Sequence, residues 1–385
     1  MLKPLFYKIL ILLGLFLVLG NCAERSKTKK SVQTATPVNL NYAEGFSISK
    51  EGAITVLKVF TPWPKAAKTY AYALVPRTHI DTINLSKVKY DAIVPTPVRS
   101  IIVTSTTHVP ALEALGQLEA LVGFPGLDLI SSKAARQQIA KGKLQELGTN
   151  MDLNIEMVLS TAPDLVMGFG IDGNNKAYET LQNSGIPVVY NGDWTEYTPL
   201  GKAEWIKFFA PFFQKEQEAD RIFDTVVQSY MNVKKMAQKA SDSPTVLTGG
   251  LYKDVWYVAG GQSWMSQFLK DANTNYLWSD TDEVGSIGLS VETVLEKGQS
   301  ADIWLNPSQH TSYKGLQAAN PTYEEFKAFT NQKVYSNAMK KGPTGGLLFF
   351  ELAPYRPDLV LEDLIAIMHP ELLPTHQPHF FMPLD

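Results

Sequence analysis

The sequence predicts an α/β protein with two Rossmann-like lobes, each built on a parallel sheet, that a long rigid helix joins. Three observations lead to this fold class. Short β-branched runs alternate with helical stretches at residues 99–203 and again at residues 244–385, which is the pattern of βαβ units. A long amphipathic stretch, residues 204–243, separates these regions, and one motif occurs in both of them. A small antiparallel β segment, residues 41–98, is expected before the first lobe.

The predicted strands of both lobes are short apolar runs, typical of parallel strands that are buried on both faces. In the first lobe they lie at residues 100–105, 121–124, 165–168 and 188–190. In the second lobe they lie at residues 245–248, 255–258, 302–305 and 333–335. The preceding segment holds three further runs, at residues 46–48, 53–60 and 69–75.

The joining helix is predicted from one apolar stripe within residues 215–240. The stripe consists of Ala219, Ile222, Phe223, Val226, Val227 and Tyr230. At ~1.5 Å per residue such a helix is about 40 Å long, enough to span two lobes and to restrict their relative motion. Pro244 ends it. Residues 204–213 and 357–369 are two further predicted helices.

The composition is that of an ordinary globular chain. The 385 residues are 45% hydrophobic and 19% charged, with a formal net charge of −3. This length is sufficient for two lobes. A nucleic-acid partner would require a basic surface, so we expect none. We expect the chain to act as a monomer.

The first residues predict export. Lys3 and Lys8 come before an apolar run at residues 9–19, which is shorter than the ~20 residues of a membrane span. Residues 19–22 resemble the bacterial lipobox, in which the cysteine receives lipid after cleavage. Residues 1–21 are therefore a predicted signal peptide and Cys22 a predicted lipidation site. The alternative is an ordinary signal peptide with a chance cysteine.

Residues 22–40 are the predicted tether, because residues 24–37 are rich in Ser, Thr and Lys and offer little apolar surface to bury. The protein would then lie in the cell envelope, on the periplasmic side, with lipid holding it to a membrane. Cys22 is the single cysteine of the chain, which excludes an internal disulfide.

One motif occurs once in each lobe. Residues 153–159 and 289–295 share a leucine, a small polar residue, a β-branched residue, a glutamate and Val-Leu, and each is followed by a strand that begins with Ala and Asp. Asn154 and Ser290 suit helix N-caps. Glu156 and Glu292 then fall in the first helical turn, where a carboxylate is favourable even without a partner.

Several short motifs, in this order, resemble the bacterial substrate-binding proteins of ABC importers that carry iron-siderophores, haem and cobalamin. The resemblance covers roughly residues 99–373. The motifs lie at residues 99–103, 114–116, 121–123, 163–166, 260–263, 271–273, 356–359 and 369–371. It implies a metal chelate as ligand, no intrinsic cofactor, no catalysis, and a permease with its ATPase as partners. It also implies that Glu156 and Glu292 dock onto permease arginines; the alternative is that they serve only the helix N-termini.

Residues that follow the predicted strands are the candidates for ligand contact, because ligands bind beyond the carboxyl ends of parallel strands. The candidates are Ser105, Thr106, His108, Phe124, Phe169, Asp172, Trp194, Tyr252, Trp264, Asn306, His310, Tyr355 and Arg356, with Asp193, Phe349 and Phe350 beside them. The many aromatic residues suit a flat or amphipathic chelate, although each could equally be part of the core. His108 and His310 are possible ligands to the metal of a chelate. We expect no site for a bare metal ion, which needs three or four clustered ligands.

Parts of the sequence are also compatible with two other functions. Residues 168–173 fit G-x-G-x-x-G after a strand, with Asp193 at the end of the next strand, which is the spacing of a dinucleotide site. The turn at residues 172–175 delays the helix that pyrophosphate needs. No hydrolase motif is present. A lipoprotein that captures its ligand without a permease is the other alternative.

Overall fold

The computed structural model describes residues 35–385 apart from 84–88 and 151. The predicted signal peptide, the lipidation site Cys22 and most of the predicted tether lie outside the described residues. From residue 35 onward, the helices that are described do not combine the length and the apolar character that crossing a membrane requires.

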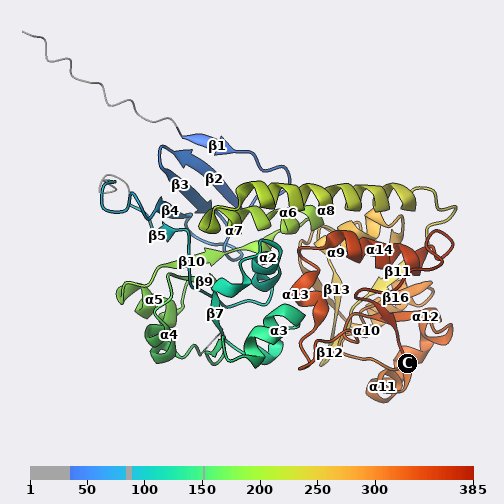
Figure 1. Cartoon of the computed structure of the whole chain (residues 1–385). Helices are drawn as coiled ribbons and strands as arrows, with labels where there is room; N and C mark the ends of the chain where they lie inside the picture. The colour runs from blue at the N-terminus through green and yellow to red at the C-terminus, as the bar shows by residue number, and fades with distance from the viewer. Residues whose placement is uncertain (1–34, 84–88, 151) are drawn as a thin grey trace, which may run out of the picture. The chain divides into compact units, whose positions relative to one another are not determined.

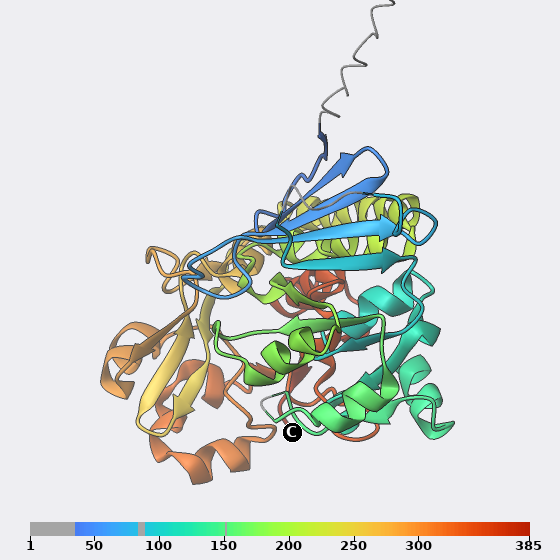
Figure 2. The same cartoon turned by 90° about the vertical axis from the view of Figure 1, so that its left-hand side faces the viewer.

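The first region is a five-stranded sheet in the order β1-β2-β3-β4-β5. Its strands are β1 (Thr36–Val38), β2 (Phe46–Glu51), β3 (Ile54–Val59), β4 (Tyr70–Pro76) and β5 (Ala92–Thr96). The pairs are antiparallel except for β4 and β5, which are parallel. The predicted antiparallel lead-in is thus confirmed, with one parallel strand added at its edge. Figure 2 shows this sheet with helix α8 behind it.

The first lobe is built on a five-stranded parallel sheet in the order β10-β9-β6-β7-β8. The strands are β6 (Ile101–Val103), β7 (Leu121–Phe124), β8 (Gln145–Glu146), β9 (Leu165–Phe169) and β10 (Val188–Asn191). The helices are α2 (His108–Ala114), α3 (Lys133–Ala140), α4 (Ile155–Thr161) and α5 (Lys176–Asn183), with the short 3₁₀ turns η1 (Leu118–Ala120), η2 (Leu127–Leu129) and η3 (Asp193–Thr195).

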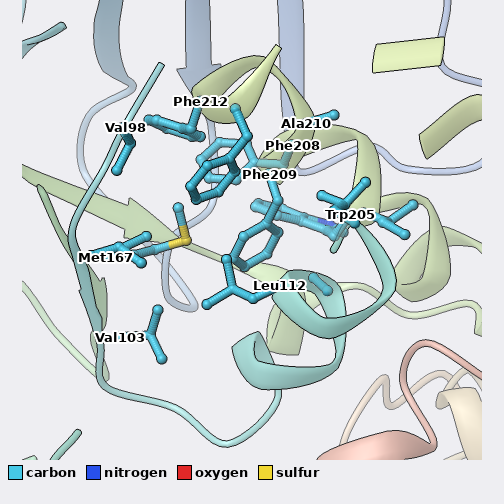
Figure 3. Packing of buried hydrophobic residues seen from close by; sticks show 14 of the residues in the cluster. Val98, Val103, Leu112, Met167, Trp205, Phe208, Phe209, Ala210 and Phe212 are labelled. Atoms are coloured by element: carbon cyan, nitrogen blue, oxygen red, sulfur yellow. The ribbon is translucent and has the colours of Figure 1, made fainter. Parts of the chain in front are cut away.

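The helices that follow the first lobe are α6 (Pro199–Glu204), α7 (Ile206–Phe213) and α8 (Glu216–Ala237). The helix predicted at residues 204–213 is interrupted at Trp205, which ends α6 and precedes α7. Phenylalanines of α7 fill the core above the first parallel sheet, against Val103, Leu112 and Met167 (Figure 3).

Helix α8 runs along both lobes (Figure 1). It contributes to both hydrophobic cores, as the apolar stripe predicts. Ala219, Phe223 and Val226 belong to the core of the first lobe. Tyr230 and Val233, further along the same helix, belong to the core of the second lobe. Because one helix is shared by two cores, a change in the distance between the lobes must strain or repack it.

The second lobe has two sheets, in the orders β14-β11-β16-β17-β18 and β12-β13-β15. The first is parallel except for β18, and its strands are β11 (Thr245–Thr248), β14 (Asn275–Tyr276), β16 (Ile303–Leu305), β17 (Val334–Ser336) and β18 (Met382–Pro383). The second is antiparallel, with β12 (Gly250–Tyr252), β13 (Val255–Ala259) and β15 (Ser286–Leu289). The run at residues 255–258, predicted as a parallel strand, therefore lies in the antiparallel sheet.

The helices of the second lobe are α9 (Trp264–Asp271), α10 (Val291–Gly298), α11 (Tyr313–Ala319), α12 (Lys327–Thr330), α13 (Leu348–Leu352) and α14 (Pro357–Met368), with one 3₁₀ helix, η4 (Pro321–Glu325). Helix α14 packs along α8, and α13 contacts α2 of the first lobe. The contact between α13 and α2 places the two lobes side by side at the carboxyl ends of their strands.

Both lobes repeat the same buried hydrogen bonds at the end of their first strand. Thr104 Oγ1 lies 2.8 Å from the Tyr178 hydroxyl and accepts a backbone N–H at 2.9 Å. Thr248 Oγ1 lies 3.0 Å from the Tyr276 hydroxyl and accepts a backbone N–H at 3.1 Å. The two lobes thus share internal hydrogen bonding as well as the motif seen in the sequence.

Candidate functional site

A cavity of about 260 Å³ lies between the two lobes, and we call it the interlobe cleft. Its first-lobe wall follows strands β6 and β10 and continues onto α6, while its second-lobe wall comes from α9 and α13. The lining residues are Ser105, Thr106, Thr107, Asp193, Trp194, Lys202, Trp264, Phe349, Phe350 and Pro354. The carboxyl ends of parallel strands therefore face this cavity, where ligands of such sheets bind.

The first-lobe wall carries hydroxyl groups on the turn between β6 and α2. Ser105 Oγ lies 3.0 Å from Thr107 Oγ1, and the Ser105 carbonyl accepts from the His108 N–H at 3.1 Å. These bonds hold the turn, and hydroxyls keep further capacity to donate and accept. This wall can therefore form hydrogen bonds to a polar ligand group.

Lys202 places a buried ammonium group beside these hydroxyls. Its Nζ donates to the carbonyls of Asp193 and Trp194 at 3.1 and 3.0 Å, and it lies 5.2 Å from the centre of the Trp264 ring. Burial lowers the pKa of Lys202 to about 8, while the nearby Asp193 carboxylate opposes this shift. The group is thus a cation at neutral pH.

Several buried polar groups in the cleft wall and behind it have no hydrogen-bond partner among the described residues. Asp193 is 2% exposed, and in the described part of the chain neither of its carboxylate oxygens has a hydrogen-bond partner. The same holds for both ring nitrogens of His108 and for the Tyr355 hydroxyl. Burial lowers the pKa of His108 to about 4, so its ring is neutral at pH 7, and burial with the Asp193 charge raises the pKa of Tyr355. Buried polar atoms of this kind are costly unless a ligand or water satisfies them.

Aromatic rings form the rest of the wall. Trp264 packs against Phe349 with ring centres 5.7 Å apart, and Phe349 meets Phe350 edge to face at 5.8 Å. Phe350 is 54% exposed. On the opposite lobe, Trp194 packs against Phe169 at 5.6 Å. The first-lobe wall thus combines polar groups with the Trp194 ring, whereas the second-lobe wall is mainly aromatic.

Four of the residues predicted for ligand contact, Ser105, Thr106, Trp194 and Trp264, line the interlobe cleft. Phe169 contacts one of them through its ring. Three residues named beside these candidates also line the cleft: Asp193, which follows a strand, and Phe349 and Phe350, which are expected at the rim.

The remaining predicted residues lie elsewhere. Phe124 is 1% exposed in the core of the first lobe. Asp172 accepts the Asn174 N–H in an exposed turn, and Tyr252 is 66% exposed at the end of β12.

Two further predicted residues serve the structure of the second lobe. The Asn306 side-chain oxygen accepts the Asn337 N–H, and the His310 ring meets Tyr323 edge to face. Partial burial lowers the pKa of His310. Arg356 is held by Asp358 through two hydrogen bonds of 2.9 and 2.8 Å.

Tyr355 and Arg356 line a second, larger cavity of about 760 Å³, which we call the rear cavity. It lies between α2, α3, α7, α8 and α13, and α13 separates it from the interlobe cleft. At its edge the Glu351 carboxylate accepts the backbone N–H groups of Ser131 and Ser132 at 2.6 and 2.8 Å. Burial raises the pKa of Glu351 to about 7, and the nearby Glu113 adds to this shift. Glu351 thus links the two lobes.

The sequence prediction missed Lys202. A helix start was readable at Thr198-Pro199, since threonine is a good N-cap and proline suits the first helical position. In the structure Thr198 Oγ1 accepts the Gly201 N–H at 3.0 Å and α6 begins at Pro199. A helix that begins at Pro199 includes Lys202 and places its side chain close to the residues that follow β10.

Glu156 and Glu292 occupy equivalent places on the two lobes. Each is exposed in the first turn of its helix, α4 or α10. Asn154 caps α4 by accepting the Met157 N–H at 3.1 Å, and Ser290 caps α10 in the same way at 3.2 Å. Each cap thus satisfies one N–H of its helix, and hydrogen bonds to its own N–H and to Ser290 lower the pKa of Glu292. Both carboxylates are exposed, so another surface can reach them.

The glycines of residues 168–173 accommodate aromatic rings. A Cβ on Gly168 would lie 2.8 Å from the Tyr178 ring, and Cβ atoms on Gly170 and Gly173 would meet Trp63 at 3.1 and 3.3 Å. Helix α5 begins only at Lys176. The glycine spacing therefore has a packing explanation that requires no dinucleotide.

Two archaeal relatives cover most of the chain. One uncharacterized lipoprotein of Methanocaldococcus jannaschii is 28% identical over 300 residues, which are 75% of this chain and 70% of the relative. A second uncharacterized lipoprotein of the same organism is 24% identical over 391 residues and covers 96% of both chains. Both are named as lipoproteins, and neither name states a ligand.

Solved structures share the two-lobed fold. A possible iron-binding, periplasmic solute-binding protein from Staphylococcus epidermidis matches with a TM-score of 0.56 at 18% identity, over 71% of this chain and 100% of that one. A periplasmic heme binding protein from Pseudomonas aeruginosa matches with a TM-score of 0.55 at 19% identity, over 75% and 98%.

The match to a sequence family covers more than half of the chain. Residues 101–338, which include both parallel sheets up to β17, match the family described as periplasmic binding protein. This is a family of binding proteins rather than of enzymes, in agreement with the absence of a catalytic motif from the sequence. The chain belongs to the periplasmic binding protein family.

Proposed function

We propose that this protein is the substrate-binding lipoprotein of an ABC importer, and that it captures a metal chelate in the interlobe cleft and delivers it to a permease. The observation that carries the proposal is the cleft itself, which lies at the carboxyl end of the first parallel sheet. Its first-lobe wall carries hydroxyls, an ammonium group and the Trp194 ring, and its second-lobe wall carries aromatic rings. Such a cleft suits a ligand with a flat apolar part and a polar or anionic edge.

The chelate is an iron-siderophore, haem or cobalamin. Similar folds include a possible iron-binding protein, a periplasmic heme binding protein and a periplasmic vitamin B12 binding protein. The cleft volume of about 260 Å³ lies just below the ~300–1,000 Å³ of pockets that enclose a drug-sized ligand. A large chelate would therefore remain partly exposed or require the lobes to separate slightly.

The ligand is tested by fluorescence titration of ligand-free protein with haem, cyanocobalamin and a ferric siderophore. One of the three is expected to bind at one equivalent, with weaker binding by Trp194→Leu and Trp264→Leu and unchanged binding by Tyr257→Leu, an exposed residue of β13. Native mass spectrometry of protein from its own host identifies the natural ligand. The chelate proposal fails if none of the three binds and the natural ligand contains no metal.

Delivery to a permease is proposed through Glu156 and Glu292, whose exposed places on the two lobes suit a surface that spans both. Exposed ion pairs contribute orientation more than affinity. The double variant Glu156→Gln with Glu292→Gln is therefore expected to bind ligand normally and to support much less uptake. Glu296→Gln, exposed on the same helix α10, is the control. Unchanged uptake would favour ligand capture without a permease.

A lipid on Cys22 is proposed as the anchor, and the names of the two archaeal lipoproteins support it. Cys22→Ser, expressed in the natural host, is expected to move from the membrane fraction to the soluble fraction. Mass spectrometry of the mature N-terminus should find acyl chains on Cys22 in the unaltered protein. An unmodified cysteine there would favour the ordinary signal peptide.

A further inference from the structure

The segment that follows α14 folds back against this helix through one buried carboxylate. Asp363 is 1% exposed and accepts the backbone N–H groups of His379, Phe380 and Phe381 at 2.8, 2.6 and 2.9 Å. It also bonds to His376 Nε2 at 2.6 Å. This carboxylate therefore fixes the positions of both histidines relative to α14.

Three metal-ligating side chains meet at this place, and we call them the C-terminal histidine cluster: Glu362, His376 and His379. One ligand atom from each lies within 4.8 Å of the other two, and all three residues are half-buried. His379 Nε2 is 3.6 Å from Glu362 Oε2. Zinc bonds of ~2.0–2.2 Å in a tetrahedral site place ligand atoms roughly 3.3–3.6 Å apart, so this pair needs little movement to share an ion.

The tautomer of His376 is suited to metal binding. Because Asp363 Oδ1 is an acceptor, His376 Nε2 carries the proton that it donates across 2.6 Å. Nδ1 then keeps its lone pair. A carboxylate that accepts from the other ring nitrogen of a ligating histidine orients the ring and raises its basicity, as in many metal sites. Asp363 is thus a positioning residue for this cluster.

We propose that Glu362, His376 and His379 bind a divalent transition-metal ion of the zinc class, with the fourth tetrahedral position open to water. Two imidazoles and one carboxylate form a ligand set typical of zinc. None of these residues lines the interlobe cleft, so this site is separate from the proposed cargo site and independent of the proposed function. The ion would fasten the C-terminal segment, just before β18, to α14.

The test uses the full mature protein, freed of metal with a chelator and titrated with Zn²⁺ against a chromophoric indicator. One tight Zn²⁺ per chain is expected, with affinity at least about ten-fold weaker in His376→Gln and in His379→Gln. His79→Gln, an exposed histidine in the turn after β4, is the matched control and should bind as the unaltered protein does. Bound Co²⁺ should give the intense visible absorption of a tetrahedral site in the unaltered protein and in His79→Gln only.

A second measurement separates loss of the site from loss of the fold. Zn²⁺ should raise the thermal midpoint of the unaltered protein, and His379→Gln should keep its own midpoint but lose this response. Two results overturn the proposal: no tight Zn²⁺ in the unaltered protein, or full binding retained by both histidine variants. Binding that is lost in Asp193→Asn and kept in His379→Gln would place the ion in the interlobe cleft, which also overturns it.

Discussion

The two lobes hold their first strands with the same hydrogen bonds, yet they present different side chains to the interlobe cleft. Thr104 with Tyr178 in the first lobe matches Thr248 with Tyr276 in the second. At the carboxyl edge of the first lobe, however, stand hydroxyls, Lys202 and a buried carboxylate, whereas the second lobe contributes mainly aromatic rings. The two lobes therefore share a scaffold but offer a ligand different contacts: mainly hydrogen bonds and charge from the first lobe, and mainly aromatic surface from the second.

A second difference between the lobes concerns the elements that complete their hydrophobic cores. The core of the first lobe includes side chains of the β1–β5 sheet and of α7, whereas that of the second lobe is completed by α9, α14 and its own C-terminal segment. Helix α8 is the shared part. Because this helix is shared, we expect the two lobes to unfold together.

The largest effect is expected from truncating one large side chain in each core. Phe212 and Phe268 are both 0% exposed, one in each core, and Phe→Ala in a core costs about 3–5 kcal/mol. Because α8 belongs to both cores, each variant should lower the midpoint of one common transition in urea, followed by circular dichroism and by tryptophan fluorescence. Two separate transitions, with only one of them moved by each variant, would show that the lobes are independent.

The next effect concerns the contact that holds the lobes together at the rear cavity. Glu351 has a pKa of about 7 in the folded protein against an ordinary 4.5, so the folded state binds the proton more tightly. Stability should therefore fall as the pH rises from about 4.5 to 7, by about 3 kcal/mol, and level off above 7. The free energy of unfolding measured across this range should lose most of this slope in Glu351→Gln. A slope that persists unchanged would assign it to other groups.

A smaller effect is expected at the polar wall of the cleft. Lys202 has a pKa of about 8, so its charge is present at pH 7 and is lost as the pH rises through 8. If its ammonium meets an anionic ligand group, Lys202→Met should weaken binding by about 2 kcal/mol, the typical value of a hydrogen bond to a charged group. Binding by the unaltered protein should weaken between pH 7 and 9, and binding by Lys202→Met should not. Equal pH profiles would show that the ligand is neutral at this wall.

Much of the fold is readable from local patterns, because buried parallel strands and a shared helix impose strong constraints on composition. The run at residues 101–103 and the stripe from Ala219 to Tyr230 appear in the structure as β6 and α8. The run at residues 255–258 is equally apolar but pairs in an antiparallel sheet. A short apolar run is typical of a buried parallel strand but also occurs in buried antiparallel strands, so its direction depends on the connections between strands.

The site is readable only in part, because the sequence shows which residues follow strands but not which elements cover them. Trp194 and Trp264 follow this rule and line the cleft. Phe124 also follows a strand, yet it is enclosed in the core. His376 and His379 are close in sequence, but Glu362 reaches them only because the chain reverses after α14. Such clusters depend on tertiary contacts.

The smallest effect tests the repeat itself. Tyr178→Phe and Tyr276→Phe each remove a buried hydroxyl that contacts a threonine, at a cost of about 1 kcal/mol each. Urea midpoints should shift equally with unchanged slopes, while Tyr257→Phe, half-exposed on β13, should not shift. If only one of the two variants is destabilised, the threonine–tyrosine hydrogen bond of the other lobe does not contribute to the free energy of unfolding. Equal costs would instead mean that both lobes use the same bonds to fix the ends of β6 and β11.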